Sequence, residues 1–268
     1  MTGDPGAAVA VLALPVALLV TPLAYARGTA LRRSNYRGRS VSLVGGVVAL
    51  VLAACAGGAL GVPSLRAVGG ATAVAVLAAG TVGLFDDLFG TPAAKGLAGH
   101  ARALLRGRVT TGAVKAFVVG LGALGAALVL DGATPRALLD TVLVAGWANL
   151  VNLFDLRPGR ALKVVLIVTL PLLFARSVAL VAGWLAGTVA GLLPYDLRER
   201  TMLGDTGANA LGAAVGVLLA ALARDVVVAA AVAVLVVALT VASERVSFTK
   251  VIEGVGPLRR LDALGRRA

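Results

Sequence analysis

Three short acidic segments interrupt an otherwise apolar chain, and they carry Asp86 and Asp87, Asp155, and Asp205. Each segment follows or precedes a hydrophobic stretch long enough to cross a bilayer. Carboxylates are costly next to hydrocarbon, so several near one membrane face indicate a functional site. Adjacent carboxylates repel each other, and a divalent cation relieves that repulsion. Magnesium prefers a few carboxylates together with phosphate oxygens. The expected chemistry is therefore metal-assisted reaction of a phosphorylated substrate at a membrane surface.

The second segment places Asn149, Asn152 and Asp155 three residues apart at the end of a predicted helix. This spacing puts the three side chains along one helix face. A polar stripe on a membrane helix faces either the bundle interior or a water-filled cleft. Hydrogen bonding between helices is the structural alternative. Arg157 and Arg160 follow directly, in a position to meet a substrate phosphate.

The third segment, Gly204–Gly207, opens another predicted helix. Asp205 and Asn209 lie four residues apart and share a face of it. Backbone N–H groups at a glycine-flanked helix N-terminus offer a site for phosphate. The alternative is that Asp205 or Thr206 is simply the helix N-cap.

A basic stretch runs from Lys95 to Lys115, and Pro92 is predicted to start a short amphipathic helix that ends near Arg106. His100, the one histidine of the chain, lies within it. It is either a solvated, hydrogen-bonded side chain or a group that transfers a proton or contacts phosphate.

The elements that must position these residues are membrane helices. Hydrophobic residues make up 59% of the 268 residues and charged residues 14%, which is typical of a polytopic membrane protein. We predict an all-α bundle of nine spans within residues 1–242, followed by a cytoplasmic amphipathic tail at 243–268. The predicted spans are Ala7–Tyr25, Val41–Val62, Ala67–Phe85, Gly112–Leu130, Ala137–Phe154, Ala161–Phe174, Ser177–Leu193, Ala208–Leu222 and Asp225–Ala242.

Charge orients this bundle. Alternate loops hold only Arg66, Arg136, Arg176 and Arg224, whereas the other loops and the tail are rich in Lys and Arg. The positive-inside rule then places the N-terminus outside, the C-terminus in the cytoplasm, and all three acidic segments on the cytoplasmic face. The net charge of +12 predicts attraction to anionic lipid headgroups and phosphorylated solutes, with no nucleic acid as partner.

These segments, in this order on one membrane face, resemble the polyprenyl-phosphate N-acetylhexosamine-1-phosphate transferases of glycosyltransferase family 4. Gly83–Asp87 resembles the aspartate-pair motif of that family, and Asn149–Asp155 resembles its Asn-x-x-Asn-x-x-Asp segment. Met202–Gly207 is similar to its Met-Gly-Asp-x-Gly stretch. Gly45-Gly46 and Lys95-Gly96-Leu97 match two shorter family features. The match spans residues 45 to 212, and the order and shared sidedness of the motifs make it specific.

The resemblance implies a bacterial plasma-membrane enzyme in which undecaprenyl or another polyprenyl phosphate attacks the β-phosphate of a UDP-sugar and UMP leaves. It implies Mg²⁺, or Mn²⁺, held by Asp205 with help from Asp86, Asp87 and Asp155. Asp86 and Asp87 would orient or deprotonate the lipid phosphate. Asn152 would line the nucleotide pocket together with Asp155. Lys95 would neutralise phosphate, and a homodimer is left open.

The chain also departs from the family pattern. Pro158 stands where relatives carry a second acidic residue, Met202 stands where they often carry an aromatic residue, and the histidine cluster is missing. These changes leave the nucleotide base open. One alternative is a non-catalytic relative that binds lipid phosphate or nucleotide beside envelope-synthesis enzymes. A transporter fits less well, because no charged residue lies deep within a predicted span.

Overall fold

The computed structural model describes residues 31–58, 65–90 and 96–266, together with positions 13–14, 16–18 and 20–22. Most of the predicted first span, Ala7–Tyr25, lies outside these ranges, as does Lys95. His100 lies in a described helix, but its side chain is outside the description.

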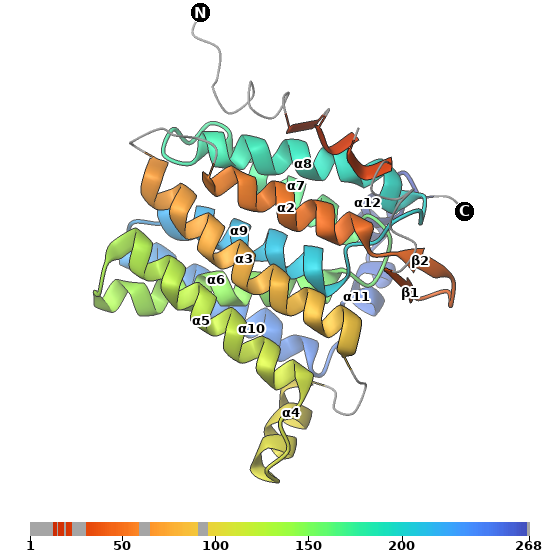
Figure 1. The fold of residues 1–268 in the computed structure, drawn as a ribbon, viewed down its shortest axis with the longest axis horizontal. Helices are drawn as coiled ribbons and strands as arrows, with labels where there is room; N and C mark the ends of the chain where they lie inside the picture. Colours follow the sequence, from red (N-terminus) through yellow and green to blue (C-terminus); the bar gives the residue numbers. More distant parts are fainter. Residues whose placement is uncertain are drawn as a thin grey trace, which may run out of the picture.

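The described chain is an all-α bundle whose helices lie side by side (Figure 1). Six of these helices are long and apolar enough to cross a bilayer. They are α3 (Arg66–Phe89), α5 (Thr111–Asp131), α6 (Pro135–Phe154), α8 (Ala179–Leu197), α9 (Gly204–Leu222) and α10 (Val226–Ser243). Two shorter helices, the apolar α2 (Val44–Gly58) and α7 (Arg160–Leu172), pack with them in the described part of the chain. The prediction of a membrane helix bundle is confirmed, and each predicted span from Val41 onward overlaps one of these helices.

Helix α9 is the centre of the bundle and packs against α2, α3 and α6. Almost all of its residues are buried, and many of them are Gly or Ala. At Gly216, a Cβ atom would lie 2.6 Å from the Cα of Val144 in α6, so no side chain larger than hydrogen fits there. Small residues let helix backbones approach closely in lipid, where packing replaces the hydrophobic effect as the source of association. This packing fixes the start of α9, which carries Asp205.

A short hairpin, which the hydropathy of the sequence does not predict, packs against the bundle beside the start of α9. Strands β1 (Arg32–Ser34) and β2 (Ser40–Ser42) pair antiparallel, with Arg33 opposite Val41. The Asn35 side chain closes the turn by accepting hydrogen bonds from the backbone N–H groups of Arg37 and Arg39. The N–H of Met202 donates to the Ser42 carbonyl, so the hairpin is tied to the α8–α9 connection.

Three further helices are short. Helix α4 (Gly96–Leu105) lies within the predicted amphipathic segment and projects from the bundle. Helices α11 (Phe248–Gly254) and α12 (Gly256–Ala263) follow α10 and lie at the same end of the bundle as the hairpin (Figure 1).

The opposite end of the bundle is closed by an ion-pair network. Arg136 donates to the fully buried Asp140 at 2.8 Å and to the carbonyls of Ala223 and Arg224 beyond the end of α9. A cation suits the negative end of a helix dipole. This network therefore fastens α6 to α9 at the end away from the acidic segments.

Candidate active site

Asp87 joins the end of α3 to the start of α9. Its Oδ1 accepts a hydrogen bond from the Asp205 N–H at 3.0 Å, and its Oδ2 accepts from the N–H and the hydroxyl of Thr206 at 2.9 and 2.6 Å. The residue at the N-cap position of α9 is Leu203, which makes no side-chain cap. Asp87 therefore supplies the cap from another helix, with its negative charge at the positive end of the dipole.

This cap corrects one expectation about the start of α9. The N–H groups of Asp205 and Thr206 are engaged by Asp87 and are not free for a phosphate, and neither residue caps the helix with its own side chain. Asp87 is therefore a group that holds Asp205 in place.

Lys115 brings a cation between two of the expected carboxylates. Its Nζ lies 3.1 Å from Asp86 Oδ2 and also contacts Asp205 Oδ2. The three side chains come from α5, α3 and α9, and each is between 19% and 26% exposed, so the cluster is within reach of a ligand. Lys115 is a site residue that the sequence did not predict. The available signal was a lysine inside an apolar span, which is a functional candidate on that ground alone.

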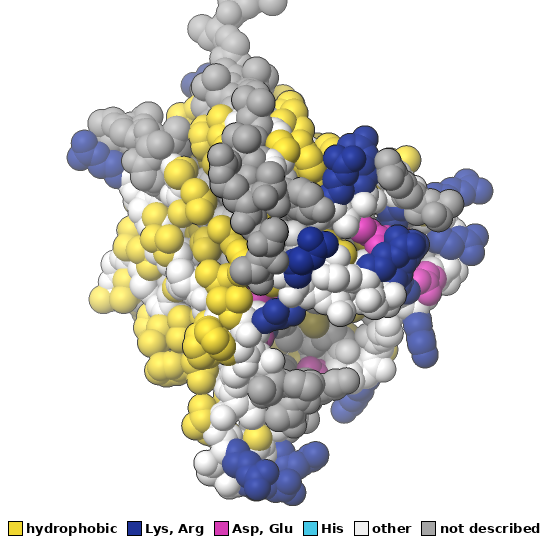
Figure 2. Space-filling view, turned by 45° about the vertical axis from the view of Figure 1, so that its right-hand side comes forward, with side chains coloured by type: hydrophobic (Ala, Val, Ile, Leu, Met, Phe, Trp, Pro, Cys, Tyr) yellow, Lys and Arg dark blue, Asp and Glu magenta, His cyan; other side chains and the backbone are white. Residues whose placement is uncertain are grey.

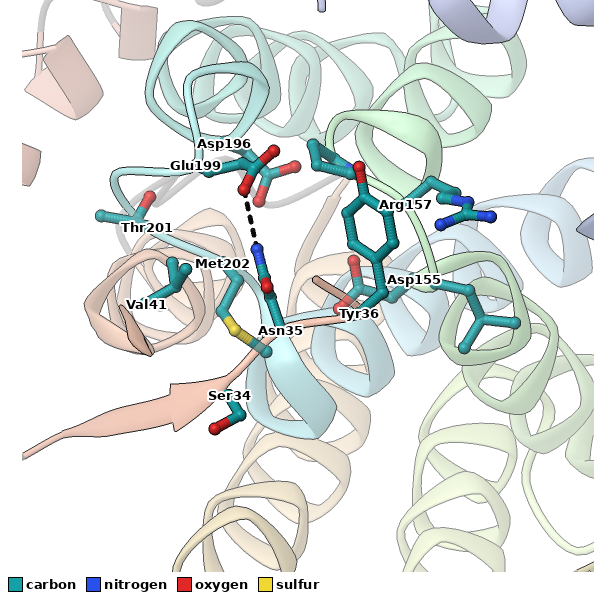
Figure 3. Close-up of a pocket in the computed structure, with 12 residues that line it drawn as sticks. Ser34, Asn35, Tyr36, Val41, Asp155, Arg157, Asp196, Glu199, Thr201 and Met202 are labelled. Carbon is teal, nitrogen blue, oxygen red and sulfur yellow. Dashed lines mark hydrogen bonds between the residues drawn. The ribbon is translucent and has the colours of Figure 1, made fainter. Parts of the chain in front are cut away.

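Asp155 lies just past the end of α6 and opens onto a cavity of about 330 Å³. Burial raises the pKa of the Asp155 carboxyl well above its usual range, and the nearby charges of Asp196, Asp205 and Asp87 add to this. Asp155 therefore lines the cavity and lies close enough to Asp205 and Asp87 for their negative charges to act on it. Its lining residues are Ser34, Asn35, Tyr36, Val41, Asp155, Leu156, Arg157, Pro158, Asp196, Glu199, Thr201 and Met202 (Figure 3).

The hairpin forms one side of this cavity. The Tyr36 ring packs against the Arg157 guanidinium, whose Cζ lies 4.3 Å from the ring centroid (Figure 3). Asn35 donates to Glu199 Oε2 at 2.8 Å. Glu199 has a φ of 53°, which is rare for a residue other than glycine and is held here by the surrounding contacts. The cavity thus presents an aromatic face, a guanidinium and several carboxylates.

Three other residues expected to bind substrate have partners within the protein. Asn149 donates to Thr240 of α10 at 3.3 Å, which is the interhelical hydrogen bond given above as the alternative. Asn209 is buried and donates to the Asp205 backbone carbonyl at 2.7 Å. Arg160 is 3% exposed and its guanidinium binds Asp262 and Thr249. The buried ion pair places Arg160, contrary to expectation, in the framework around the site, and the substrate-binding roles of Asn149 and Asn209 stay predictions.

The carboxylates of this region are the groups that could hold the expected magnesium ion. Within the described ranges, no group of three or more His, Cys, Asp or Glu side chains is arranged to hold a metal ion. Asp86 and Asp205 nevertheless converge on one cation, the Lys115 ammonium. Two carboxylates at a partly open position fit magnesium, which keeps several waters and takes further ligands from substrate phosphate. Asp86 and Asp205 are the two carboxylates at this position, whereas both Asp87 oxygens accept hydrogen bonds at the start of α9.

Gly83 allows α3 to touch the backbone that carries Asp205. A Cβ atom at this position would overlap the Asp205 carbonyl group and lie 2.9 Å from Thr206 Cα. We expect Gly83→Ala to displace Asp205 and to lower any activity of the site by about 100-fold, the scale of a 1 Å misplacement. The matched control is Gly120→Ala in α5, where a Cβ would meet nothing within 4 Å. Equal activity of the two variants, measured as initial rates, would contradict this expectation.

Comparison with known proteins gives one family. A family model described as glycosyl transferase family 4 matches residues 70–223, which run from α3 to the end of α9 and include Asp86, Lys115, Asp155 and Asp205. No curated protein matches the chain.

Proposed function

Because the chain belongs to glycosyl transferase family 4, whose model covers more than half of its residues, we propose that it transfers a sugar-1-phosphate from a UDP-sugar to a polyprenyl phosphate. The family implies a multi-pass membrane phosphoglycosyl transferase that uses a nucleotide sugar and a polyprenyl phosphate acceptor. The UDP-sugar donor, undecaprenyl phosphate as the acceptor, magnesium as the cofactor, and a role in bacterial envelope synthesis are parts of the proposal.

The observation that carries the proposal is the Asp86–Lys115–Asp205 cluster beside the cavity that Asp155 opens onto. A nucleotide sugar needs two kinds of site, a charged one for its diphosphate and a hollow for its nucleoside. The cluster provides the first and the neighbouring cavity the second. The reaction also needs an acceptor phosphate at the membrane surface, and the cluster lies at the ends of helices long enough to span a bilayer.

In the proposed reaction, an oxygen of the lipid phosphate forms a bond to the β-phosphorus of the donor. The bond from that phosphorus to the oxygen bridging the α- and β-phosphates breaks, and the nucleoside monophosphate leaves with the bridging oxygen. Lys115 offers its ammonium to the phosphate oxygens, where charge accumulates. Asp87 holds the α9 N-terminus so that Asp205 stays opposite Asp86. Asp86 and Asp205 would hold magnesium, which when bound neutralises diphosphate charge.

The proposed orientation places this site in the cytoplasm, with nine spans and the N-terminus outside. Lys and Arg side chains gather on the side of the molecule that carries the hairpin and α12, with acidic side chains between them, while hydrophobic side chains cover the adjoining surface (Figure 2). This distribution supports a cytoplasmic face that attracts anionic substrates and an apolar surface that contacts lipid.

The test is a transfer assay on the detergent-purified protein with undecaprenyl phosphate, magnesium and a panel of nucleotide sugars. We expect release of nucleoside monophosphate that depends on the lipid, the metal and one donor. Release by hydrolysis in the absence of lipid would contradict the proposal. Tight donor binding without release from any donor would instead identify a non-catalytic relative.

A further inference from the structure

The segment from Phe248 to Arg266, called here the tail segment, folds back onto the connection between α6 and α7. That connection, Asp155–Gly159, supplies four consecutive residues of the cavity wall, from Asp155 to Pro158. The proposed function assigns no role to the tail segment. Its contacts show what it does to this wall.

The tail segment contacts both the connection and the two residues that flank it. Before the connection, the ring of Phe248 stacks on Phe154, the last residue of α6, with centroids 5.1 Å apart. Within the connection, the Pro158 carbonyl accepts a hydrogen bond from Arg266 Nε at 2.7 Å, and Arg157 pairs with Glu253 at 3.3 Å. Two of the residues that the tail segment contacts, Arg157 and Pro158, line the cavity themselves.

After the connection, Asp262 of the tail segment forms an ion pair with Arg160, the first residue of α7. Arg160 donates from Nε and Nη2 to the two Asp262 oxygens at 2.8 and 2.9 Å, and from Nη1 to the Thr249 hydroxyl at 2.8 Å. Arg266 makes a second two-point pair with the same carboxylate. Bidentate guanidinium–carboxylate pairs fix orientation as well as distance. Lys163 adds hydrogen bonds to the carbonyls of Leu261 and Asp262.

The Arg160–Asp262 ion pair is buried, and both of its groups stay charged. Arg160 is 3% and Asp262 10% exposed in their side chains. Burial opposes ionisation of Asp262, but hydrogen bonds from Arg160 and Arg266 outweigh it and lower the pKa of its carboxyl to about 2. Its stabilising contribution is therefore present above the unfolded pKa of about 4 and is lost as the pH falls through about 2. Removing one partner of a buried pair leaves an uncompensated charge, which is strongly unfavourable.

We propose that the tail segment supports the wall of the donor cavity that residues Asp155–Pro158 form. Asp262 is the positioning residue: it holds this wall in place through Arg160 and Arg266. The statement that the cavity binds the sugar donor rests on the proposed function. The statement that the tail segment keeps the α6–α7 connection ordered does not rest on it, because it concerns only the backbone of that connection. Asp262 lies outside the cavity lining, so its effect on a donor has to act through this connection.

The experiment compares Asp262→Asn with Arg259→Gln, which removes a charge from an exposed position of α12. Hydrogen exchange of the full-length protein in detergent reports on backbone order in residues 154–163 without requiring turnover. We expect faster exchange there in Asp262→Asn and none of this change in Arg259→Gln. Unchanged exchange in a folded Asp262→Asn protein would overturn the proposal, whether or not the protein is an active transferase.

The second readout separates positioning from a general loss of structure. We expect Asp262→Asn to raise the donor KM by roughly 10- to 100-fold with a smaller change in kcat, because it loosens a binding wall and leaves Asp86, Lys115 and Asp205 in place. An equal fall in kcat at unchanged KM would overturn the donor-cavity assignment. If wild type releases no nucleotide but exchange increases as expected, the proposed function fails and the support role stands.

If the Asp262→Asn protein fails to fold, the Arg266→Gln variant takes its place in the exchange experiment. Arg266→Gln keeps the Arg160–Asp262 pair and removes the hydrogen bond to the Pro158 carbonyl. Faster exchange confined to residues 155–159 in this variant is the expected result. Exchange equal to wild type there would overturn the proposal.

Discussion

Asp205→Asn is expected to lower sugar-phosphate transfer by about 100- to 1,000-fold, the usual cost of removing one well-placed charged group from an active site. Asp205 shares the Lys115 ammonium with Asp86 and faces the phosphate site of the proposed reaction. Asparagine keeps the size of the side chain and removes its charge. The ammonium would then lose its contact with one of two carboxylates, and a magnesium ion would lose a ligand. The measurement is the initial rate of nucleoside monophosphate release at saturating donor and lipid.

The matched control is Asp225→Asn. Asp225 caps α10 by accepting hydrogen bonds from the N–H groups of Val227 and Val228, at the opposite end of the bundle from the acidic cluster. The same chemical change there is expected to leave the transfer rate unchanged. If Asp205→Asn retains more than a tenth of wild-type activity while remaining folded, the assignment of the reaction to this cluster is wrong.

The helices were predictable because their signal is local. Apolar stretches of about 20 residues identify membrane spans, and the predicted Ala67–Phe85 and Ala208–Leu222 lie within or coincide closely with α3 and α9. Even the short predicted span Ala161–Phe174 corresponds to a short helix, α7, with Pro171 in its last turn. The hairpin was not predictable in the same way, because each of its strands has only three residues. Its position depends on the contact of Ser42 with the α8–α9 connection.

The acidic residues of the site were predictable by type and sidedness, but their partners were not. Asp87 caps a helix that begins more than a hundred residues later in the chain, and Arg160 pairs with Asp262 across a similar separation. Such pairings depend on which helices are neighbours, and hydropathy carries no information about that. Arg160 was therefore assigned to substrate phosphate, although in the fold its guanidinium is buried against the tail segment. Lys115 was likewise interpreted only as part of the basic stretch, because hydropathy does not show that α5 packs against α3.

Asp87→Asn is expected to lower both transfer and stability, which distinguishes it from Asp205→Asn. The Asp87 carboxylate accepts three hydrogen bonds, two from backbone N–H groups and one from the Thr206 hydroxyl. Asparagine has one acceptor oxygen and an NH₂ group that would face a donor. Hydrogen bonds to charged groups contribute about 1.5–3 kcal/mol each, so we expect the free energy of unfolding to fall by about 2 kcal/mol. Release of the α9 N-terminus should also lower transfer, by about 100-fold.

Thr206→Val separates the two consequences of losing this cap. It removes the hydroxyl hydrogen bond and leaves both backbone N–H groups on Asp87, so we expect a loss of about 1.5 kcal/mol in unfolding free energy and a much smaller fall in transfer. Thermal unfolding in detergent and initial transfer rates measure the two quantities on the same preparations. A structural cap predicts that stability and transfer fall together along the series wild type, Thr206→Val, Asp87→Asn. If Asp87→Asn abolished transfer at unchanged stability, Asp87 would have to contact the reacting phosphates directly, and its role as a cap for α9 would not explain the site.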